Sequence, residues 1–145
     1  MTACADLLYD PADPSSRFRG IGVVLVVDAV PGVDLKGVEF YDDRKAVIFA
    51  HSLVNQRNRG IMALGGARVP VTVRVVWHDS TKIVGRKDNP NINTYDGNII
   101  GDYTLPIAQR IPAELLKDIR SRGGALRLKF RLKADGVLFG WDIER

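Results

Sequence analysis

The sequence is poor in the residues that most often carry chemistry. Its 145 residues include one cysteine, Cys4, and two histidines, His51 and His78. A single cysteine excludes an internal disulfide framework and a Cys-x-x-Cys zinc site. The sequence has no His-Glu-x-x-His pattern for zinc and no Gly-x-Ser-x-Gly turn for a nucleophile. We therefore expect a protein that is not an enzyme and that has no catalytic residues, no metal site and no cofactor.

Long apolar runs are also missing, since none reaches the roughly 20 residues that a membrane-spanning helix needs. The formal net charge of +4 is modest, and the basic residues are scattered rather than gathered in a tail. This pattern contains no nucleic-acid-binding motif, so we expect no nucleic-acid partner. A hydrophobic content of 46% is enough, in a chain of this length, for the core of a single domain.

The lone cysteine stands in an informative position. Met1-Thr2-Ala3-Cys4 resembles the end of a bacterial lipoprotein signal, in which small residues precede the cysteine that becomes lipidated. No charged or apolar signal region precedes this box. We predict a lipid on Cys4 that anchors the protein in the periplasm, with Ala5 favouring the outer membrane. The alternative is an accidental terminal cysteine in a cytosolic protein.

Residues 5–16 have the composition of a tether. The steps Asp10-Pro11 and Asp13-Pro14 favour extended or turn backbone and exclude a helix through this stretch. We therefore divide the chain into a lipobox remnant and flexible tether over residues 1–16 and a single β-rich domain over residues 17–145. The alternative is an ordinary frayed N-terminus.

Apolar runs bounded by turn residues predict strands over most of the domain. The predicted strands cover residues 21–30, 37–41, 46–52, 60–64, 71–77 and 99–107. The run over residues 21–30 is almost wholly apolar, so we expect it to be covered on both faces. His51 and His78 lie at strand ends, where packing or solvent exposure explains them.

One helix is predicted over about residues 111–122. Pro112 suits its first turn, an apolar stripe follows, and Gly123-Gly124 ends it. Together with the strands this predicts a β-rich α+β fold. We expect mainly an antiparallel sheet or sandwich with one helix packed on it.

The C-terminal residues predict a hairpin. Leucine and phenylalanine alternate with arginine and lysine over residues 126–133, and Asp135-Gly136 is a strong two-residue turn. Pairing across that turn places apolar residues opposite apolar ones and cations opposite carboxylates. The pairs are Phe130 with Trp141, Leu132 with Phe139, Leu128 with Ile143, Lys129 with Asp142 and Arg127 with Glu144. Arg131 and Lys133 are left without acidic partners and are candidates for partner binding.

Residues 79–98 are rich in turn formers, and we expect a long exposed loop there. Its alternating asparagines mimic a calcium loop, but Pro90 and Thr94 break that pattern. Tyrosine among Asn and Asp is typical of recognition loops, which suggests that part of this loop binds a protein. The candidate contact residues are Arg86, Lys87, Asn91, Asn93, Tyr95 and Asp96. The alternative is an insertion without a role.

Residues 71–145 carry a wider pattern. It begins with Val71-Thr72-Val73-Arg74-Val75-Val76-Trp77 and continues with Tyr103-Thr104-Leu105-Pro106-Ile107, Ile111-Pro112, Gly136 and Trp141. This arrangement resembles small Gram-negative lipoproteins of unknown function that occur beside type VI secretion effectors, notably lipases, as immunity proteins. The long Asn-rich loop departs from that pattern.

The resemblance implies a periplasmic, membrane-tethered protein that binds and blocks a toxin and has no catalytic residues. We therefore expect an immunity-type lipoprotein that neutralises a secreted antibacterial toxin, such as a lipase effector. The alternative is a structural or assembly lipoprotein of the bacterial cell envelope.

Overall fold

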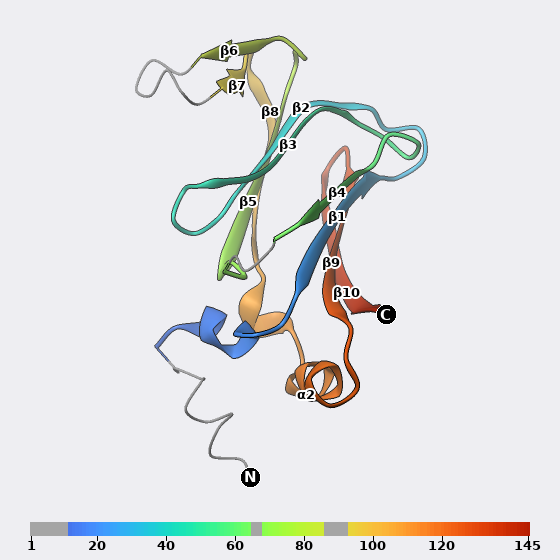
Figure 1. Cartoon of the computed structure of the whole chain (residues 1–145). Helices are drawn as coiled ribbons and strands as arrows, with labels where there is room; N and C mark the ends of the chain where they lie inside the picture. Colours follow the sequence, from blue (N-terminus) through green and yellow to red (C-terminus); the bar gives the residue numbers. More distant parts are fainter. Residues whose placement is uncertain (1–11, 65–67, 86–92) are drawn as a thin grey trace.

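The computed structural model describes residues 12–64, 68–85 and 93–145 (Figure 1). Two four-stranded sheets form a sandwich, with one α-helix and a small hairpin added, which confirms the predicted β-rich α+β fold. In chain order the elements are η1 (Pro14–Phe18), β1 (Val23–Ala29), β2 (Leu35–Tyr41), β3 (Val47–Val54), β4 (Gly60–Ala63), β5 (Thr72–His78), β6 (Ile83–Gly85), β7 (Asn93–Tyr95), β8 (Ile99–Pro106), η2 (Ala108–Arg110), α2 (Ala113–Arg122), β9 (Ala125–Lys133) and β10 (Gly136–Glu144).

The first sheet has the strand order β10-β9-β1-β4, the second has β3-β2-β5-β8, and β6-β7 is a separate pair. Paired strands are antiparallel except β1 and β9, which run parallel from Val23↔Leu126 to Ala29↔Leu132. A parallel pair needs a long crossover. Here the whole second sheet, β4 of the first sheet and α2 lie between β1 and β9 in the chain.

Each sheet turns one row of side chains into a shared core. Leu25 and Val27 of β1 are completely buried. Phe130 of β9 meets Phe40 of β2 edge to face, with ring centroids 5.0 Å apart, and Phe40 meets Phe49 of β3 at 5.2 Å. Such aromatic pairs add about 0.5–1.5 kcal/mol beyond the burial of their area. The Phe40–Phe130 contact joins the two sheets, and the Phe40–Phe49 contact lies within the second sheet.

The outward row of β1 corrects one expectation. The strand was expected to be covered on both faces, but Val24, Val26 and Asp28 are only half-buried and alternate with buried neighbours. Within the described part of the chain, no second layer lies across this outer face (Figure 1). The outward apolar side chains are covered partly by their neighbours in the same sheet.

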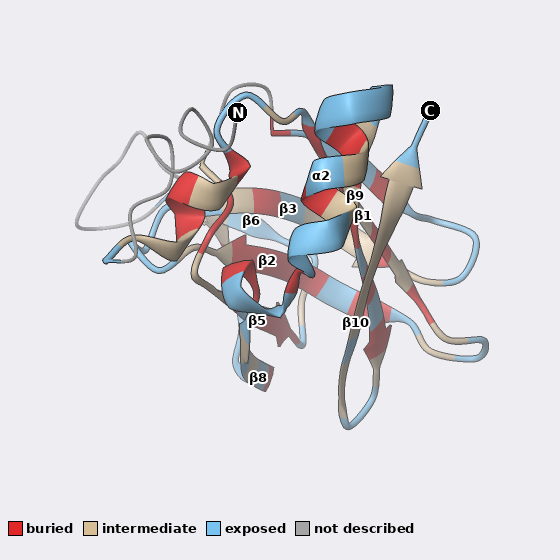
Figure 2. Cartoon of the chain, turned by 90° about the horizontal axis from the view of Figure 1, so that it is seen from below, coloured by how far each residue is buried: buried red, intermediate tan, exposed pale blue. Residues whose placement is uncertain are grey.

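The helix α2 closes one end of the sandwich, nearest the viewer in Figure 2. Leu116 and Ile119 on its inner side are buried. Pro112 precedes the helix as its N-cap residue rather than lying in the first turn. Gly123 takes a φ of 84° and donates its N–H to the Ile119 carbonyl at 2.8 Å, which ends the helix as predicted.

The β9–β10 hairpin exists, but its predicted register is wrong by two residues. Lys133 pairs with Gly136, so the two-residue loop is Ala134-Asp135 and not Asp135-Gly136. A shift of two keeps every side chain on its predicted face, because the side-chain period of a strand is two. The observed pairs include Phe130↔Phe139, Leu128↔Trp141 and Arg127↔Asp142. Trp141 is half-buried.

The segment of residues 79–98 is not one long loop. Strands β6 and β7 pair in it, with Ile83 opposite Tyr95 and Gly85 opposite Asn93. Tyr95 is 9% exposed, so the expectation of an exposed tyrosine is wrong. Asp96 is exposed and donates its N–H to the Lys82 carbonyl at 2.7 Å. Arg86, Lys87 and Asn91 lie outside the described residues.

The N-terminal division also needs correction. Cys4 and residues 1–11 lie outside the described residues, so the lipidation prediction stays a prediction. Residues 14–16, assigned to the tether, instead belong to η1, and Ser15 and Ser16 are buried. Asp13 caps this turn by accepting the Ser15 N–H at 3.2 Å. The folded domain therefore begins before residue 17.

Candidate binding surface

The outer face of the first sheet combines exposed apolar and charged side chains. A groove of about 680 Å³ runs across it. Its lining comes from β1, β4, β9, β10 and the turn before β4. We call it the basic groove and define it by Val26, Asp28, Arg59, Ile61, Arg127, Lys129, Arg131, Leu138 and Gly140.

The floor of the basic groove is apolar. Val26 and Ile61 are direct neighbours in the β1–β4 register, so their side chains share the outer face. Ile61 is 73% exposed, and Leu138 on the far side of the sheet is 49% exposed. Gly140 lies between Leu138 and Asp142 on β10, and a Cβ placed there would meet nothing within 4 Å. The missing side chain at Gly140 deepens the hollow.

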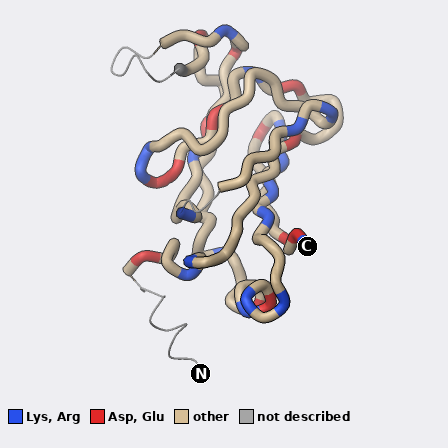
Figure 3. Tube along the Cα trace, viewed as in Figure 1, with Lys and Arg blue, Asp and Glu red and all other residues tan. Residues whose placement is uncertain are grey.

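A basic ridge follows β9 through the groove. Arg127, Lys129 and Arg131 alternate with core residues along this strand, so all three point outward. Figure 3 shows Lys and Arg along this strand, alternating with other residues. Lys129 is 51% exposed and Arg131 is 58% exposed. Arg59, also exposed, adds a fourth cation from the turn before β4.

Carboxylates hold the two ridge arginines in place. Arg131 donates from Nε and Nη2 to Asp28 at 3.0 and 2.9 Å. Arg127 donates from the same two nitrogens to Asp142 at 2.6 and 2.8 Å. These hydrogen bonds raise the pKa of both guanidinium groups, and the bond from Arg127 is the main reason that the pKa of Asp142 is lowered. Arg127, Arg131 and Asp142 therefore keep their charges over the ordinary pH range.

The pairing leaves donors for a ligand. Each guanidinium uses Nε and Nη2, and in the described residues neither Nη1 of these two arginines has a partner. A guanidinium has five N–H donors in a rigid fork. The basic groove has four cations. Three of them pair with two carboxylates, Arg127 and Lys129 with Asp142 and Arg131 with Asp28. The surface therefore presents fixed, oriented positive charge beside apolar area, which suits an acidic partner.

Among the predicted contact residues that the structure describes, Arg131 is the one that lies in the basic groove. The expectation that Arg131 and Lys133 lack acidic partners is wrong. Asp28 stands directly beside Arg131 in the parallel β1–β9 pair, and Lys133 lies 3.7 Å from Asp135. Parallel pairing joins residues more than one hundred positions apart, which local pattern does not reveal. Lys133 lies at the hairpin end of β9, beyond the groove.

Sequence reasoning assigned two other groove cations, Arg127 and Lys129, to structural pairing alone. They do pair with Asp142, Lys129 at 3.4 Å, yet they still line the groove. Sequence reasoning missed Arg59, Ile61, Leu138 and Gly140. The alternation of basic and apolar residues in β9 was the one sequence signal for this surface. The other groove residues could not be identified from it, because they depend on which strands flank β9.

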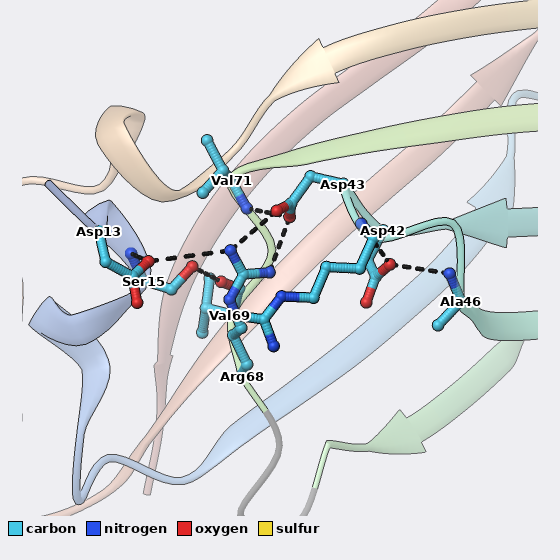
Figure 4. A network of polar contacts seen from close by, with 9 residues as sticks. Asp13, Ser15, Asp42, Asp43, Ala46, Arg68, Val69 and Val71 are labelled. Atoms are coloured by element: carbon cyan, nitrogen blue, oxygen red, sulfur yellow. Dashed lines mark hydrogen bonds and ion pairs between the residues drawn. The ribbon is translucent and has the colours of Figure 1, made fainter.

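A second polar cluster joins η1 to the turn between β2 and β3 (Figure 4). Asp43 accepts from both terminal nitrogens of Arg68 at 2.8 Å and from the Val71 N–H at 2.8 Å. Asp13 lies 3.8 Å from the same guanidinium, and the Ser15 hydroxyl donates to the Val69 carbonyl. Hydrogen bonds from Arg68 are the main cause that lowers the pKa of Asp43 to about 2. This cluster fastens the N-terminal turn to the second sheet.

The two acidic residues of that turn have different roles. Asp42 does serve the turn, by accepting the backbone N–H groups of Arg44 at 2.8 Å and Ala46 at 2.9 Å. Asp43, in contrast, holds the Arg68 cluster together. A hollow of about 200 Å³ lies beside this cluster. Since its groups bond mainly to one another, the cluster serves the fold.

Among residues 12–64, 68–85 and 93–145, no helix is long and apolar enough to cross a membrane. The same residues contain no group of three or more His, Cys, Asp or Glu side chains that could hold a metal ion. Comparison of the chain with protein-family models, with curated proteins and with solved structures finds no match. The function is therefore inferred from the chemistry of the basic groove.

Proposed function

We propose that this protein acts by binding, as an immunity-type lipoprotein that occludes a secreted antibacterial toxin with its basic groove. The observation that carries the proposal is the groove itself, where exposed apolar residues lie beside arginines fixed by carboxylates. Prearranged cations reduce the entropy that binding costs, because their side chains are already ordered. Occlusion needs complementary shape and charge rather than catalysis.

The lining of the groove supports a partner that is apolar and acidic at its contact surface. An apolar side chain of the partner would rest on Val26, Ile61 and Leu138, and acidic side chains beside it would meet Lys129 and the open Nη1 groups of Arg127 and Arg131. The resemblance of residues 71–145 to immunity lipoproteins supports a toxin as this partner, a lipase effector in the first instance. Lipid anchoring through Cys4 in the periplasm belongs to the same proposal.

A charge reversal tests the proposal. The probe is the secreted effector encoded beside this gene, purified and titrated against the protein. Lys129→Glu should weaken binding by at least about tenfold, because it turns an attraction into a repulsion. Lys117→Glu on the exposed side of α2 is the matched control, with the same change of charge away from the groove. Equal affinity for both variants would contradict the groove as the contact surface.

Protection of cells provides the functional readout. Cells that express the effector in the periplasm should survive with the wild-type protein or with Lys117→Glu, and should lose protection with Lys129→Glu. A wild-type protein that neither binds the effector nor protects the cells would contradict the immunity function altogether.

A further inference from the structure

Strand β8 forms an open edge of the second sheet. β5 pairs with it on one side, and in the part of the chain that the structure describes no strand pairs with it on the other. An unpaired edge presents backbone N–H and C=O groups that can bind another strand. Proteins usually guard such edges by making them short, by placing charges there or by covering them.

The other edges of the two sheets have such guards. β4 has only four residues. On β10, the Arg110 guanidinium lies over the rings of Phe139 and Trp141, at 5.1 and 5.8 Å, and places a cation beside that edge. Beside β3, Asn58 in the following turn donates from Nδ2 to the Leu53 carbonyl at 2.6 Å. β8 has eight residues, and its one charged side chain, Asp102, is already paired with Arg74.

The β6–β7 hairpin covers part of the same outer face but leaves β8 open. Thr94 of β7 donates to Glu39 Oε1 at 3.1 Å. Glu39 of β2 and His78 of β5, which lie under the hairpin, are 1% and 4% exposed. On β8, in contrast, the outward side chains of residues 100, 102, 104 and 106 are all exposed. An incoming strand would therefore meet no cover along β8.

The hydrogen bonds between β5 and β8 show which backbone groups of β8 point to the open edge. Ile107, the residue after β8, donates its N–H to the Val71 carbonyl at 2.9 Å. In an antiparallel pair, residues that bond to the partner alternate with residues whose N–H and C=O point away from it. The register is regular from there back through Asp102, so Asp102 and Thr104 direct these groups to the open edge. Pro106 belongs to the same alternate set, where its missing N–H costs no bond to β5.

We propose that β8 pairs with β8 of a second copy of this chain, antiparallel and centred on Tyr103. A two-fold axis at Tyr103 places Asp102 opposite Thr104 of the other copy. The N–H of each of these residues can then donate to the carbonyl of the other across the edge. On the outer face, the Thr104 hydroxyl lies beside the Asp102 carboxylate of the other copy, and Ile100 lies beside Pro106.

The neighbouring centres that suit the same hydrogen-bond pattern are less favourable. Centring on Asp102 would place two carboxylates directly opposite each other, which is destabilising. Arg74 donates to the two oxygens of Asp102 at 2.9 and 2.7 Å, and these bonds hold the pKa of Asp102 below its ordinary value, so both groups would be charged. Centring on Thr104 would place Asp102 opposite Pro106, which has no N–H to offer to the Asp102 carbonyl. The edge is therefore self-complementary when centred on Tyr103.

The pairing would join the two second sheets into one continuous sheet and remove the open edge of both copies. The basic groove lies on the first sheet, and none of its lining residues belongs to β8. The dimer needs no effector, so its formation is independent of the function proposed for the groove.

Sedimentation velocity of the purified protein over a concentration series measures the association. A reducing agent keeps Cys4 from forming a disulfide between two copies. The wild-type protein should change from monomer to dimer as its concentration rises. A protein that stays monomeric throughout the series, or that forms only larger aggregates, would overturn the proposal.

Two substitutions at one position separate the backbone from the side chain. Thr104→Pro removes an N–H that makes no bond to β5, and it should weaken dimerisation by at least about tenfold because a carbonyl of the other copy loses its donor. Thr104→Val is the matched control, since it keeps this N–H and the shape of the side chain, and it should still dimerise. Equal dimerisation of the two variants would contradict pairing at this edge.

Amide hydrogen exchange of the wild-type protein, followed by NMR, locates the contact without any variant. In the monomer the amides of Asp102 and Thr104 face water. In the dimer they should become protected by at least about tenfold, because they then exchange only when the edge opens. The Ile107 amide, which bonds to Val71, should be protected in both states. A dimer in which the Asp102 and Thr104 amides exchange as fast as in the monomer would place the contact elsewhere and overturn the proposal.

Discussion

The outer faces of the two sheets differ in how far the rest of the chain covers them. On the second sheet, Glu39 and His78 lie under the β6–β7 hairpin and are almost completely buried. On the first sheet, Lys129 and Arg131 stay more than half exposed, and no second layer covers them in the described part of the chain. Both faces carry ionisable side chains at outward positions of strands. What differs is whether another part of the chain folds over them.

This difference separates stability from binding. A buried pair of polar side chains is costly to break, because removal of one partner leaves the other without compensation. An exposed ion pair contributes little to folding, because water and salt screen it. Exposed charges keep their capacity to bind a partner. We therefore expect substitutions on the covered face to change stability and substitutions on the open face to change affinity.

The largest effect should come from the covered face. Glu39→Ala removes the acceptor of the Tyr41 and Thr94 hydroxyls and leaves His78 without its carboxylate. We expect a loss of about 3–5 kcal/mol in the free energy of unfolding, as for one partner of a buried pair. Urea denaturation measures it. A loss below about 1 kcal/mol is typical of an exposed ion pair. Such a small loss would contradict the burial of Glu39 under the hairpin.

The Asp43–Arg68 cluster, which belongs to neither outer face, should give the next largest effect. Asp43→Asn should destabilise the protein by about 1.5–3 kcal/mol near neutral pH, the range for hydrogen bonds to a charged group. Because the folded pKa is lowered from 3.8 to about 2, this stabilisation is complete above the ordinary pKa and disappears as the pH falls through that interval.

Thermal unfolding at a series of acidic pH values measures this dependence. Asp135→Asn, at a side chain that is 85% exposed, is the matched control. Asp43→Asn should flatten the acid side of the stability profile, whereas the control should reproduce the wild-type profile. An acid profile of Asp43→Asn that runs parallel to the wild type would contradict the role of this cluster.

Filling the basic groove should lower affinity without lowering stability. Gly140 has open space at its Cβ position, so Gly140→Leu fits the fold and occupies the hollow. We expect about a tenfold loss of affinity for the effector, or about 1.4 kcal/mol. Isothermal titration calorimetry measures it, and the melting temperature should remain that of the wild type.

Gly85→Leu makes the same change in β6, next to the expected recognition loop, where the Cβ also meets open space. It should leave affinity unchanged. Loss of binding in Gly85→Leu together with normal binding in Gly140→Leu would transfer the contact surface from the groove to the hairpin.

The smallest effect should come from the ion pair of the open face. Asp28→Asn removes the charge that orients Arg131, whose side chain is 58% exposed. We expect a loss of less than about 1 kcal/mol in the free energy of unfolding. Urea denaturation of Asp28→Asn and Glu39→Ala under the same conditions compares the two losses directly. Equal losses in the two variants would remove the distinction between a covered and an open face.

The local sequence pattern predicted those features of the fold that depend on residues close together in the chain. Alternation in residues 126–133 predicted which side chains of β9 face outward, and Asp135-Gly136 located the hairpin within one residue. The register still slipped by two, because either dipeptide around Asp135 can serve as the turn and both choices keep the faces. An alternating pattern therefore determines which face of the sheet a side chain lies on, but it does not determine the residue opposite it on the next strand.

Long-range contacts account for the rest. Asp28 reaches Arg131 only through the parallel pairing of β1 with β9, and no local signal marks that pairing. Glu39 stands between Val38 and Phe40, so its strand position predicts the outer face but not its burial. That burial depends on Thr94 and Tyr95 folding back from a segment that lacks strong strand character.

The central claim is that the basic groove binds the effector. A map of the residues that contact the effector in the complex tests this claim most directly. In a cross-saturation NMR experiment, the effector is irradiated in complex with the isotope-labelled protein, and signals lost from the protein report its contact residues. The account predicts losses at Ile61, Lys129 and Leu138 in the basic groove, with signals of β6 and β7 retained. Losses confined to residues 83–96, with the groove unaffected, would contradict it.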